Sequence, residues 1–127
     1  GNNRDVNRYK WNYKNITRKL SDNKTKQSIF YSNITNLLSI RRKQKAFHPN
    51  GKRHNINLGS KLFSFKRVSV DKKQSIICIT NLSSKNQTAR LKKELLNYRD
   101  LLNLKTKFKD KNLLTLKPFQ TVWLSNI

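Results

Sequence analysis

The sequence lacks methionine altogether and has little cysteine, proline, glycine or acid. It contains one cysteine, two prolines, three glycines and six acidic residues among 127. The lone cysteine, Cys78, excludes an internal disulfide and a cysteine-based metal cluster. Because Cys78 lies inside an apolar run, we expect a small buried core residue rather than a reactive thiol. A chain without a start methionine is most simply a piece of a longer one, so we expect residues before Gly1.

Long hydrophobic runs are also absent. No apolar stretch approaches the length of a membrane-spanning helix, and no signal peptide opens the chain. We therefore expect a cytoplasmic protein with no membrane partner.

Motifs for catalysis and metal binding are missing as well. The six acids are scattered, and no glycine-rich phosphate loop or nucleophile elbow is present. His48 and His54 have no cysteine or carboxylate near them in sequence to complete a metal site. We expect both histidines to be structural or solvent-facing, and we expect no cofactor. Taken alone, these residues do not build an enzyme.

Positive charge, by contrast, is abundant. Lysine and arginine number 29 against six acids, which gives a formal net charge of +23. A charge of this size is typical of nucleic-acid-binding proteins. The excess is dispersed along the chain, however, so we expect a solvated surface that attracts polyanions only non-specifically at low salt. A stand-alone basic β domain that binds nucleic acid stays open as the alternative, and it requires exposed aromatics among basic residues on one face.

The first 13 residues are polar and aromatic and have nothing apolar to bury on one face. Arg4, Asp5, Asn7 and Arg8 form a dense cluster of hydrogen-bonding groups. Three aromatic residues follow at alternate positions: Tyr9, Trp11 and Tyr13. This segment is either a solvated terminus or a loop on a scaffold, with arginine donors and aromatic faces around a polar ligand. Composition leaves both interpretations open.

Two helices are predicted in the first third of the chain. Residues 12–20 form a short helix with Asn12 as its cap, and residues 25–45 form a longer one. The apolar stripe of the longer helix consists of Ile29, Phe30, Ile34, Leu37 and Leu38. Arginine and lysine in its last turns suit the negative end of the helix dipole, so the local basic run needs no ligand to explain it.

The segment 37–51 is where the hydrophobic period changes from 3.6 to 2. Pro49 cannot extend the helix, and Asn50-Gly51 favours a turn with positive φ. No flexible serine- or glycine-rich linker separates the two patterns. We therefore expect the helix and the β part to pack together.

Short alternating strands are predicted from His54 onwards, beginning with Ile56 and Leu58. Further strands are predicted at residues 62–68, 74–82, 87–91, 113–116 and 119–124, while residues 95–104 fit either helix or strand. The unbroken apolar run at residues 76–79 indicates a central strand covered on both faces. Four aromatic residues in apolar alternating runs are expected to be buried: Phe63, Phe65, Phe119 and Trp123. The spacing of the turns predicts an antiparallel sandwich.

An ordered series of motifs runs through the whole chain. It consists of GNNRDVNR at 1–8, WNY at 11–13, LLSIRR at 37–42, AFHPNG at 46–51, LFSF at 62–65 with Arg67, ITNL at 79–82, DLL at 100–102 and LKPFQTVWL at 116–124. This series resembles the C-terminal part of sucrose phosphorylase-type enzymes of the α-amylase family. Relatives of these enzymes act on glucosylglycerol, glucosylglycerate or sucrose 6-phosphate.

The resemblance implies an α+β fragment. Residues 1–47 would be the last loop and closing helical segment of a TIM-type (β/α)8 barrel, and residues 48–127 an all-β antiparallel C-terminal sandwich. It also implies that Arg4 helps bind the glucosyl unit, while Asp5, Asn7 and Arg8 support that loop.

The activity that the resemblance implies belongs to a longer parent. There, an aspartate takes the glucosyl group from a sucrose-like α-glucoside, and inorganic phosphate releases it as glucose 1-phosphate with retention. The catalytic nucleophile, acid/base and third carboxylate would precede Gly1, so this chain alone is expected to be inactive. Without the barrel, the stripe of the longer helix would face water, and we expect low solubility. A carbohydrate-binding sandwich is a third interpretation, but it needs an exposed aromatic platform that the sequence does not clearly offer.

Overall fold

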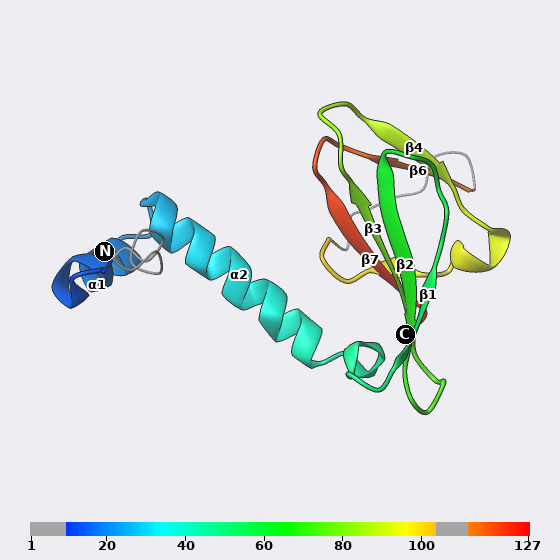
Figure 1. The fold of residues 1–127 in the computed structure, drawn as a ribbon, viewed down its shortest axis with the longest axis horizontal. Helices are drawn as coiled ribbons and strands as arrows, with labels where there is room; N and C mark the ends of the chain where they lie inside the picture. Colours follow the sequence, from blue (N-terminus) through cyan, green and yellow to red (C-terminus); the bar gives the residue numbers. More distant parts are fainter. Residues whose placement is uncertain (1–9, 104–111) are drawn as a thin grey trace, which may run out of the picture. The chain divides into compact units, whose positions relative to one another are not determined.

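The computed structural model describes residues 10–103 and 112–127 (Figure 1). The chain divides into two compact units, Gly1–Ser39 and Ile40–Ile127. The first unit is helical and the second is built mainly from strands. The predicted substrate-loop residues Arg4, Asp5, Asn7 and Arg8 lie outside the described residues.

Both predicted helices are present. Helix α1 spans Tyr13–Ser21, and the Oδ1 atom of Asn12 accepts a hydrogen bond from the Asn15 N–H at 3.2 Å, which confirms Asn12 as the cap. Helix α2 spans Lys26–Arg42, and therefore ends earlier than residue 45. The chain continues into a single 3-10 turn, η1, at Lys45–Phe47. Neither α1 nor α2 contains a buried residue.

Seven antiparallel strands and a second 3-10 turn make up the rest of the described structure. Their bounds are Lys52–Asn55 (β1), Leu62–Val68 (β2), Ser75–Asn81 (β3), Gln87–Arg90 (β4), Lys93–Leu95 (η2), Arg99–Asp100 (β5), Leu113–Leu116 (β6) and Thr121–Ser125 (β7). One sheet has five strands in the order β1-β2-β3-β7-β5, and the other pairs β4 with β6. The strand pairing between β3 and β7 brings the last strand of the chain into the middle of the larger sheet (Figure 1).

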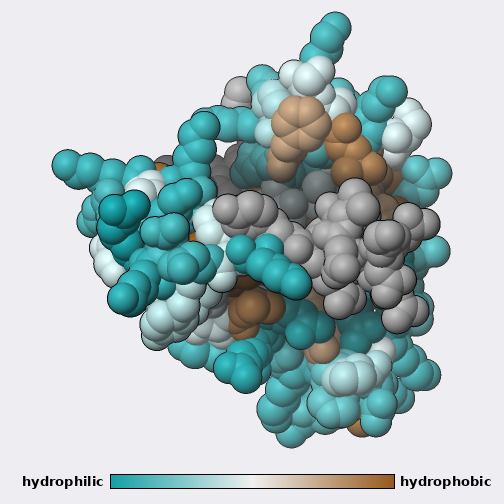
Figure 2. Space-filling model, turned by 60° about the vertical axis from the view of Figure 1, so that its left-hand side comes forward, coloured by the Kyte–Doolittle hydropathy of each residue, from teal (hydrophilic) through white to brown (hydrophobic). Residues whose placement is uncertain are grey.

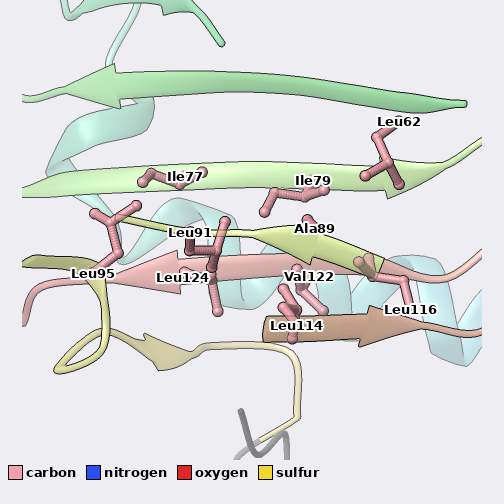
Figure 3. Packing of buried hydrophobic residues seen from close by; sticks show 10 residues of the cluster. All are labelled: Leu62, Ile77, Ile79, Ala89, Leu91, Leu95, Leu114, Leu116, Val122 and Leu124. Atoms are coloured by element: carbon pink, nitrogen blue, oxygen red, sulfur yellow. The ribbon is translucent and has the colours of Figure 1, made fainter. Parts of the chain in front are cut away.

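The main hydrophobic core lies between these two sheets, which makes the β unit a two-layer sandwich. Figure 3 shows side chains of the larger sheet meeting those of the smaller one. The cluster consists of Leu62, Ile77, Ile79, Ala89, Leu91, Leu95, Leu114, Leu116, Val122 and Leu124. Alternation places one set of side chains from each strand in this core and the other set on the outer face.

Strand β3 is the third of five, and six of its seven residues are buried, which confirms the predicted central strand. Its outward-facing residues Ile76 and Cys78 form a second, smaller cluster with Ala46. Cys78 is 4% exposed, and burial raises the pKa of its thiol to about 12. The prediction of a core cysteine is confirmed, since a thiol of this kind stays protonated and unreactive at neutral pH.

Two features of the β unit differ from the sequence-based expectation. Ile56 and Leu58 are not in a strand; the first strand is β1, whose four residues are all exposed. Ile56 still contacts β2 through its backbone, because its N–H donates a hydrogen bond to the Ser64 carbonyl at 3.2 Å. Phe63 and Phe119 are 47% and 68% exposed, so the expectation that they are buried is wrong. Phe119 occupies a turn with φ of +56° rather than the start of a strand.

The surface is dominated by polar and charged groups. The face seen in Figure 2 is mostly hydrophilic, with separate apolar patches among the teal side chains. Among residues 10–103 and 112–127, no helix has the length and apolar character needed to cross a membrane.

Candidate functional site

The segment Gln44–Gly51, which we call the junction segment, is the place where the chain enters the sandwich. Ala46 is its centre and is fully buried. Its N–H donates to Oε1 of Gln74 at 3.0 Å, and its carbonyl accepts a hydrogen bond from Nε of Arg67 at 3.1 Å. The other arm of the Arg67 guanidinium donates to the His48 carbonyl at 2.5 Å. The forked guanidinium of Arg67 on β2 therefore holds two backbone carbonyls of the junction segment.

Gln74 is the second anchor of the junction segment. Its side chain is 4% exposed, and its Nε2 atom donates to Oε1 of Gln44 at 2.7 Å and to the Ser125 hydroxyl at 3.4 Å. Its N–H donates to the Ser69 hydroxyl at 2.9 Å. In the described part of the chain, every buried side-chain nitrogen and oxygen has a hydrogen-bond partner. A network of this kind fixes the geometry of the junction segment.

Gly51 closes the junction segment by close packing of backbone. A Cβ atom built on it would lie 2.8 Å from the Val68 carbonyl oxygen and 3.1 Å from those of Ala46 and His48. The positive φ expected at Asn50-Gly51 is not found, since the described glycine with positive φ is Gly59. Gly51 is needed because backbone approaches it closely, not because of its own dihedral angles.

The DLL and TVWL motifs meet beside the junction segment. Oδ1 of the buried Asp100 accepts hydrogen bonds from the N–H groups of Leu102 and Trp123, each at 3.0 Å. The Leu101 N–H donates to the Trp123 carbonyl at 2.8 Å. The Trp123 ring in turn packs against Phe47, with centroids 4.8 Å apart and planes at 59°. Motifs far apart in sequence therefore converge on one structural assembly.

Asn81 plays the same kind of role at the other end of β3. It is fully buried, and its Nδ2 atom donates to the carbonyls of Lys85 and Lys117, each at 2.8 Å. Its Oδ1 atom accepts from the N–H and hydroxyl of Ser83 at 2.9 and 2.8 Å. The ITNL and LKPFQT motifs are thus joined by one side chain that ties two loops together.

The three aspartates of the described residues accept hydrogen bonds within turns. Asp22, Asp71 and Asp100 each accept a hydrogen bond from the N–H two residues further on, at 2.9, 3.1 and 3.0 Å. Asp71 also accepts from the Ser69 hydroxyl at 2.6 Å and pairs with the Lys45 ammonium at 3.3 Å. The Ser69 hydroxyl and the Lys73 N–H, aided by Lys45, lower the pKa of Asp71 from 3.8 to about 2. These contacts suit carboxylates that fix backbone rather than an acid and base of catalysis.

One of the two histidines, His48, accepts a hydrogen bond from the backbone, and the other, His54, is exposed to solvent. Nδ1 of His48 accepts a hydrogen bond from the Asn50 N–H at 3.2 Å, and the His48 carbonyl accepts from the Gly51 N–H at 2.9 Å. His54 is exposed on β1. Within residues 10–103 and 112–127, no group of three histidine, cysteine or acidic side chains is arranged to hold a metal ion.

Sequence reasoning did not find Gln74, Arg67 or Gly51 as anchors. Gln74 is a polar residue at the start of an apolar run, and nothing in the sequence marks it as an anchor. Only the fold brings the Ala46 N–H to its side chain. Arg67 stood within a motif but was one of many cations, and the partners of its guanidinium are main-chain atoms that no side-chain pattern reveals.

Two curated proteins are similar to this chain over most of its length. It is 30% identical over 83 residues to glucosylglycerate phosphorylase of Spirochaeta thermophila, an alignment covering 65% of this chain and 14% of that protein. It is 28% identical over 131 residues to glucosylglycerate phosphorylase of Escherichia coli, covering 98% of this chain and 21% of that protein. The chain therefore spans only a small part of the length of these relatives. No protein-family model matches it.

Solved structures share the fold. The structure of AmyP in complex with maltose superposes with a TM-score of 0.65 at 19% identity, over 79% of this chain and 21% of that one. The trehalulose synthase MutB from Pseudomonas mesoacidophila MX-45 gives a TM-score of 0.61 at 19% identity, over 86% and 19%. Together these matches confirm the resemblance to the C-terminal region of sucrose phosphorylase-type enzymes of the α-amylase family.

Proposed function

We propose that this chain is the C-terminal region of a longer α-amylase-family glucosyl phosphorylase, in which the sandwich is structural and the N-terminal loop contributes to the sugar site. The observation that carries the proposal is the junction segment. Its AFHPNG motif resembles the family, and Arg67 and Gln74 hold its backbone to the sandwich. Such an anchored entry suits a structural domain that follows another part of the same polypeptide.

The first unit supports the same proposal, because α2 exposes several large apolar side chains within the described residues. No residue of α2 is buried. Its exposed apolar and aromatic side chains are Ile29 (49% exposed), Phe30 (69%), Tyr31 (59%), Ile34 (43%) and Leu38 (49%). Large apolar side chains exposed in such number are expected to pack on another element in the complete protein. We assign that role to the catalytic barrel, with residues 1–47 as its closing segment and residues 48–127 as the C-terminal domain.

The proposed reaction is that of the parent, which we place in the cytoplasm. An α-glucoside donates its glucosyl group to an enzyme aspartate, and inorganic phosphate then releases glucose 1-phosphate with retained configuration. Arg4 would bind the glucosyl unit, and Asp5, Asn7 and Arg8 would hold its loop. The carboxylates that perform the chemistry would belong to the preceding barrel.

The test is an assay of the full-length parent with glucosylglycerate, sucrose and inorganic phosphate. We expect phosphate-dependent formation of glucose 1-phosphate from one of these α-glucosides. Arg4→Ala should lower kcat/KM by about a hundredfold, the effect of removing one positioning contact, while the thermal melt of the protein stays unchanged. Lys10→Ala is the matched control, because Lys10 is an exposed cation outside the loop motif, and it should leave kcat/KM unchanged. Equal kinetics for Arg4→Ala and the unsubstituted enzyme would remove Arg4 from the sugar site.

A second candidate function is polyanion binding on the outer face of the β1–β2 hairpin. The Arg53 guanidinium lies 4.8 Å from the Phe65 ring centroid and 5.9 Å from that of Phe63, and Phe63 is 47% exposed. An exposed aromatic beside a cation on a chain of net charge +23 is the combination that single-stranded nucleic acid requires. Binding of a single-stranded oligonucleotide that is lost on Phe63→Ala would support this function. If oligonucleotide binding weakens with salt but is unchanged in Phe63→Ala, the attraction is non-specific and this function is wrong.

A further inference from the structure

A groove opens at one end of the sandwich core, between the segment that follows β1 and the segment that follows β4. Its volume is about 460 Å³, within the range of sites that hold small molecules. The residues that line it are Asn55, Ile56, Asn57, Leu58, Lys66, Ile77, Arg90, Leu91, Lys92, Glu94 and Leu95. Neither the fold's similarity to known proteins nor the proposed sugar site assigns it a ligand.

The floor of the groove is apolar and belongs to the main core. Ile77, Leu91 and Leu95 are 1%, 3% and 7% exposed, and they lie together at the left-hand end of the cluster in Figure 3. Ile56 and Leu58 are half-buried and pack against the same cluster. Their burial explains why these two residues alternate like a strand without forming one. The floor therefore offers contact to an aliphatic or aromatic body.

Lys66 is the unusual residue in this setting. It pairs in register with Ile77, so its side chain leaves β2 on the inner face of the larger sheet, beside a residue of the main core. It is only half-buried, and it makes no side-chain hydrogen bond or ion pair among the described residues. A lysine at such a position lays its carbon stem on the apolar floor and brings its ammonium group to the rim.

The rim has an excess of positive charge. Three cationic residues, Lys66, Arg90 and Lys92, line the groove against one carboxylate, Glu94. The ion pair found in the described part of the chain, between Lys45 and Asp71, lies elsewhere. The positive charge of the groove therefore exceeds that of Glu94 and is held in no ion pair of the described residues, so an anionic group at the rim would be attracted to it.

We propose that this groove binds a small amphiphilic anion, with its apolar body on Ile77, Leu91 and Leu95 and its anionic group at Lys66. An apolar floor alone would accept a neutral molecule equally well, and cations alone would accept inorganic phosphate. The combination selects a ligand that carries both features. No residue of the groove belongs to the proposed sugar loop, so the groove proposal stands or falls independently of the proposed function.

The probe is sodium octanoate, titrated into the ¹⁵N-labelled chain and followed by the amide resonances of Leu91 and Leu95. We expect saturable shifts at these amides, with weaker binding of 1-octanol and no saturable shift with inorganic phosphate. Lys66→Gln should weaken octanoate binding about fivefold, the effect of losing one charge pair at a partly exposed site. Lys61→Gln is the matched control, since Lys61 is exposed and does not line the groove, and it should bind octanoate as the unsubstituted chain does.

Two results would overturn the proposal. One is the absence of saturable shifts at Leu91 and Leu95, including the case in which octanoate shifts only amides of α2. The other is equal affinity of the Lys66→Gln and Lys61→Gln variants. If Lys66→Gln fails to fold, the comparison of octanoate with 1-octanol on the unsubstituted chain decides the question. Equal affinity for the two would show that the cations at the rim do not contribute to binding, which would overturn the proposal.

Discussion

The guanidinium of Arg67 donates a hydrogen bond to the carbonyl of Ala46 across 21 residues of sequence. Ala46 is fully buried, so its carbonyl has no access to water and depends on this donor. The contact connects the AFHPNG motif to the second strand of the sandwich. It shows that Arg67 serves, in this part of the chain, to hold the fold.

The first prediction concerns this contact. Arg67→Ala leaves the buried Ala46 carbonyl without its donor, and a buried acceptor left unpaired costs about 1–3 kcal/mol. We expect the free energy of unfolding of the chain, measured in urea, to fall by that amount. Arg18→Ala is the control, because Arg18 is an exposed arginine on α1, and surface substitutions of this kind change stability by about 0.5 kcal/mol or less. Equal urea midpoints for the two variants would show that the Arg67 contact is not a support of the fold.

The second prediction concerns Gly51. Gly51→Ala places a Cβ atom 2.8 Å from the Val68 carbonyl oxygen, a backbone atom that cannot move without shifting β2. Overpacking of this kind costs about 1–3 kcal/mol, so the melting temperature should drop by several degrees. Asn50→Ala, at the exposed neighbouring position, should leave the melt unchanged. Equal melting temperatures for Gly51→Ala and the unsubstituted chain would show that the surrounding backbone can accommodate a Cβ atom, which would contradict this prediction.

The third prediction is a dependence of stability on pH. The folded pKa of Asp71 is about 2, below its ordinary value of 3.8, so folding favours the charged carboxylate. The resulting stabilisation is present above the unfolded pKa and is lost as pH falls from about 4 to about 2. Asp71→Asn should therefore flatten the decline of the urea midpoint over this pH range. Parallel profiles for the substituted and unsubstituted chains would assign the acid sensitivity to other carboxylates.

The fourth prediction concerns the exposed face of α2. Phe30 is 69% exposed, and the apolar residues around it have no cover within the described helical unit. We expect the isolated chain to self-associate, and Phe30→Glu to reduce the mass measured by light scattering after size-exclusion chromatography. Asn33→Glu adds the same charge to an exposed polar position of α2 and serves as the control. A clean monomer for the unsubstituted chain would contradict the account of this face.

Much of the sandwich could be predicted because its strands carry their own pattern. Strand β2 was predicted with its observed bounds, and β3 was recognised as central from its unbroken apolar run. The start of strand β1 was predicted two residues too late, at His54, because it is an edge strand of four exposed residues, stabilised by backbone pairing to β2 rather than by apolar side chains. Ile56 and Leu58 alternate because both pack against the edge of the main core. In the sequence, this alternation is indistinguishable from that of a strand.

The anchors of the junction segment could not be predicted for a different reason. Gln74 and Arg67 bind main-chain atoms, and the positions of those atoms exist only once the sandwich has formed. Phe119 was placed in a strand by its apolar neighbours, although it occupies a turn with positive φ and is exposed. The loop around Arg4 stays a prediction, because it lies outside the described residues.

The central claim is that this chain is the C-terminal region of a glucosyl phosphorylase. The most direct measurement is to read the coding DNA immediately before the codon of Gly1. The account predicts an open reading frame that continues upstream in frame and encodes a (β/α)8 barrel with its catalytic aspartate, glutamate and second aspartate. A stop codon followed by a separate start would contradict it, since the chain would then be a short basic protein without a catalytic partner in the same polypeptide.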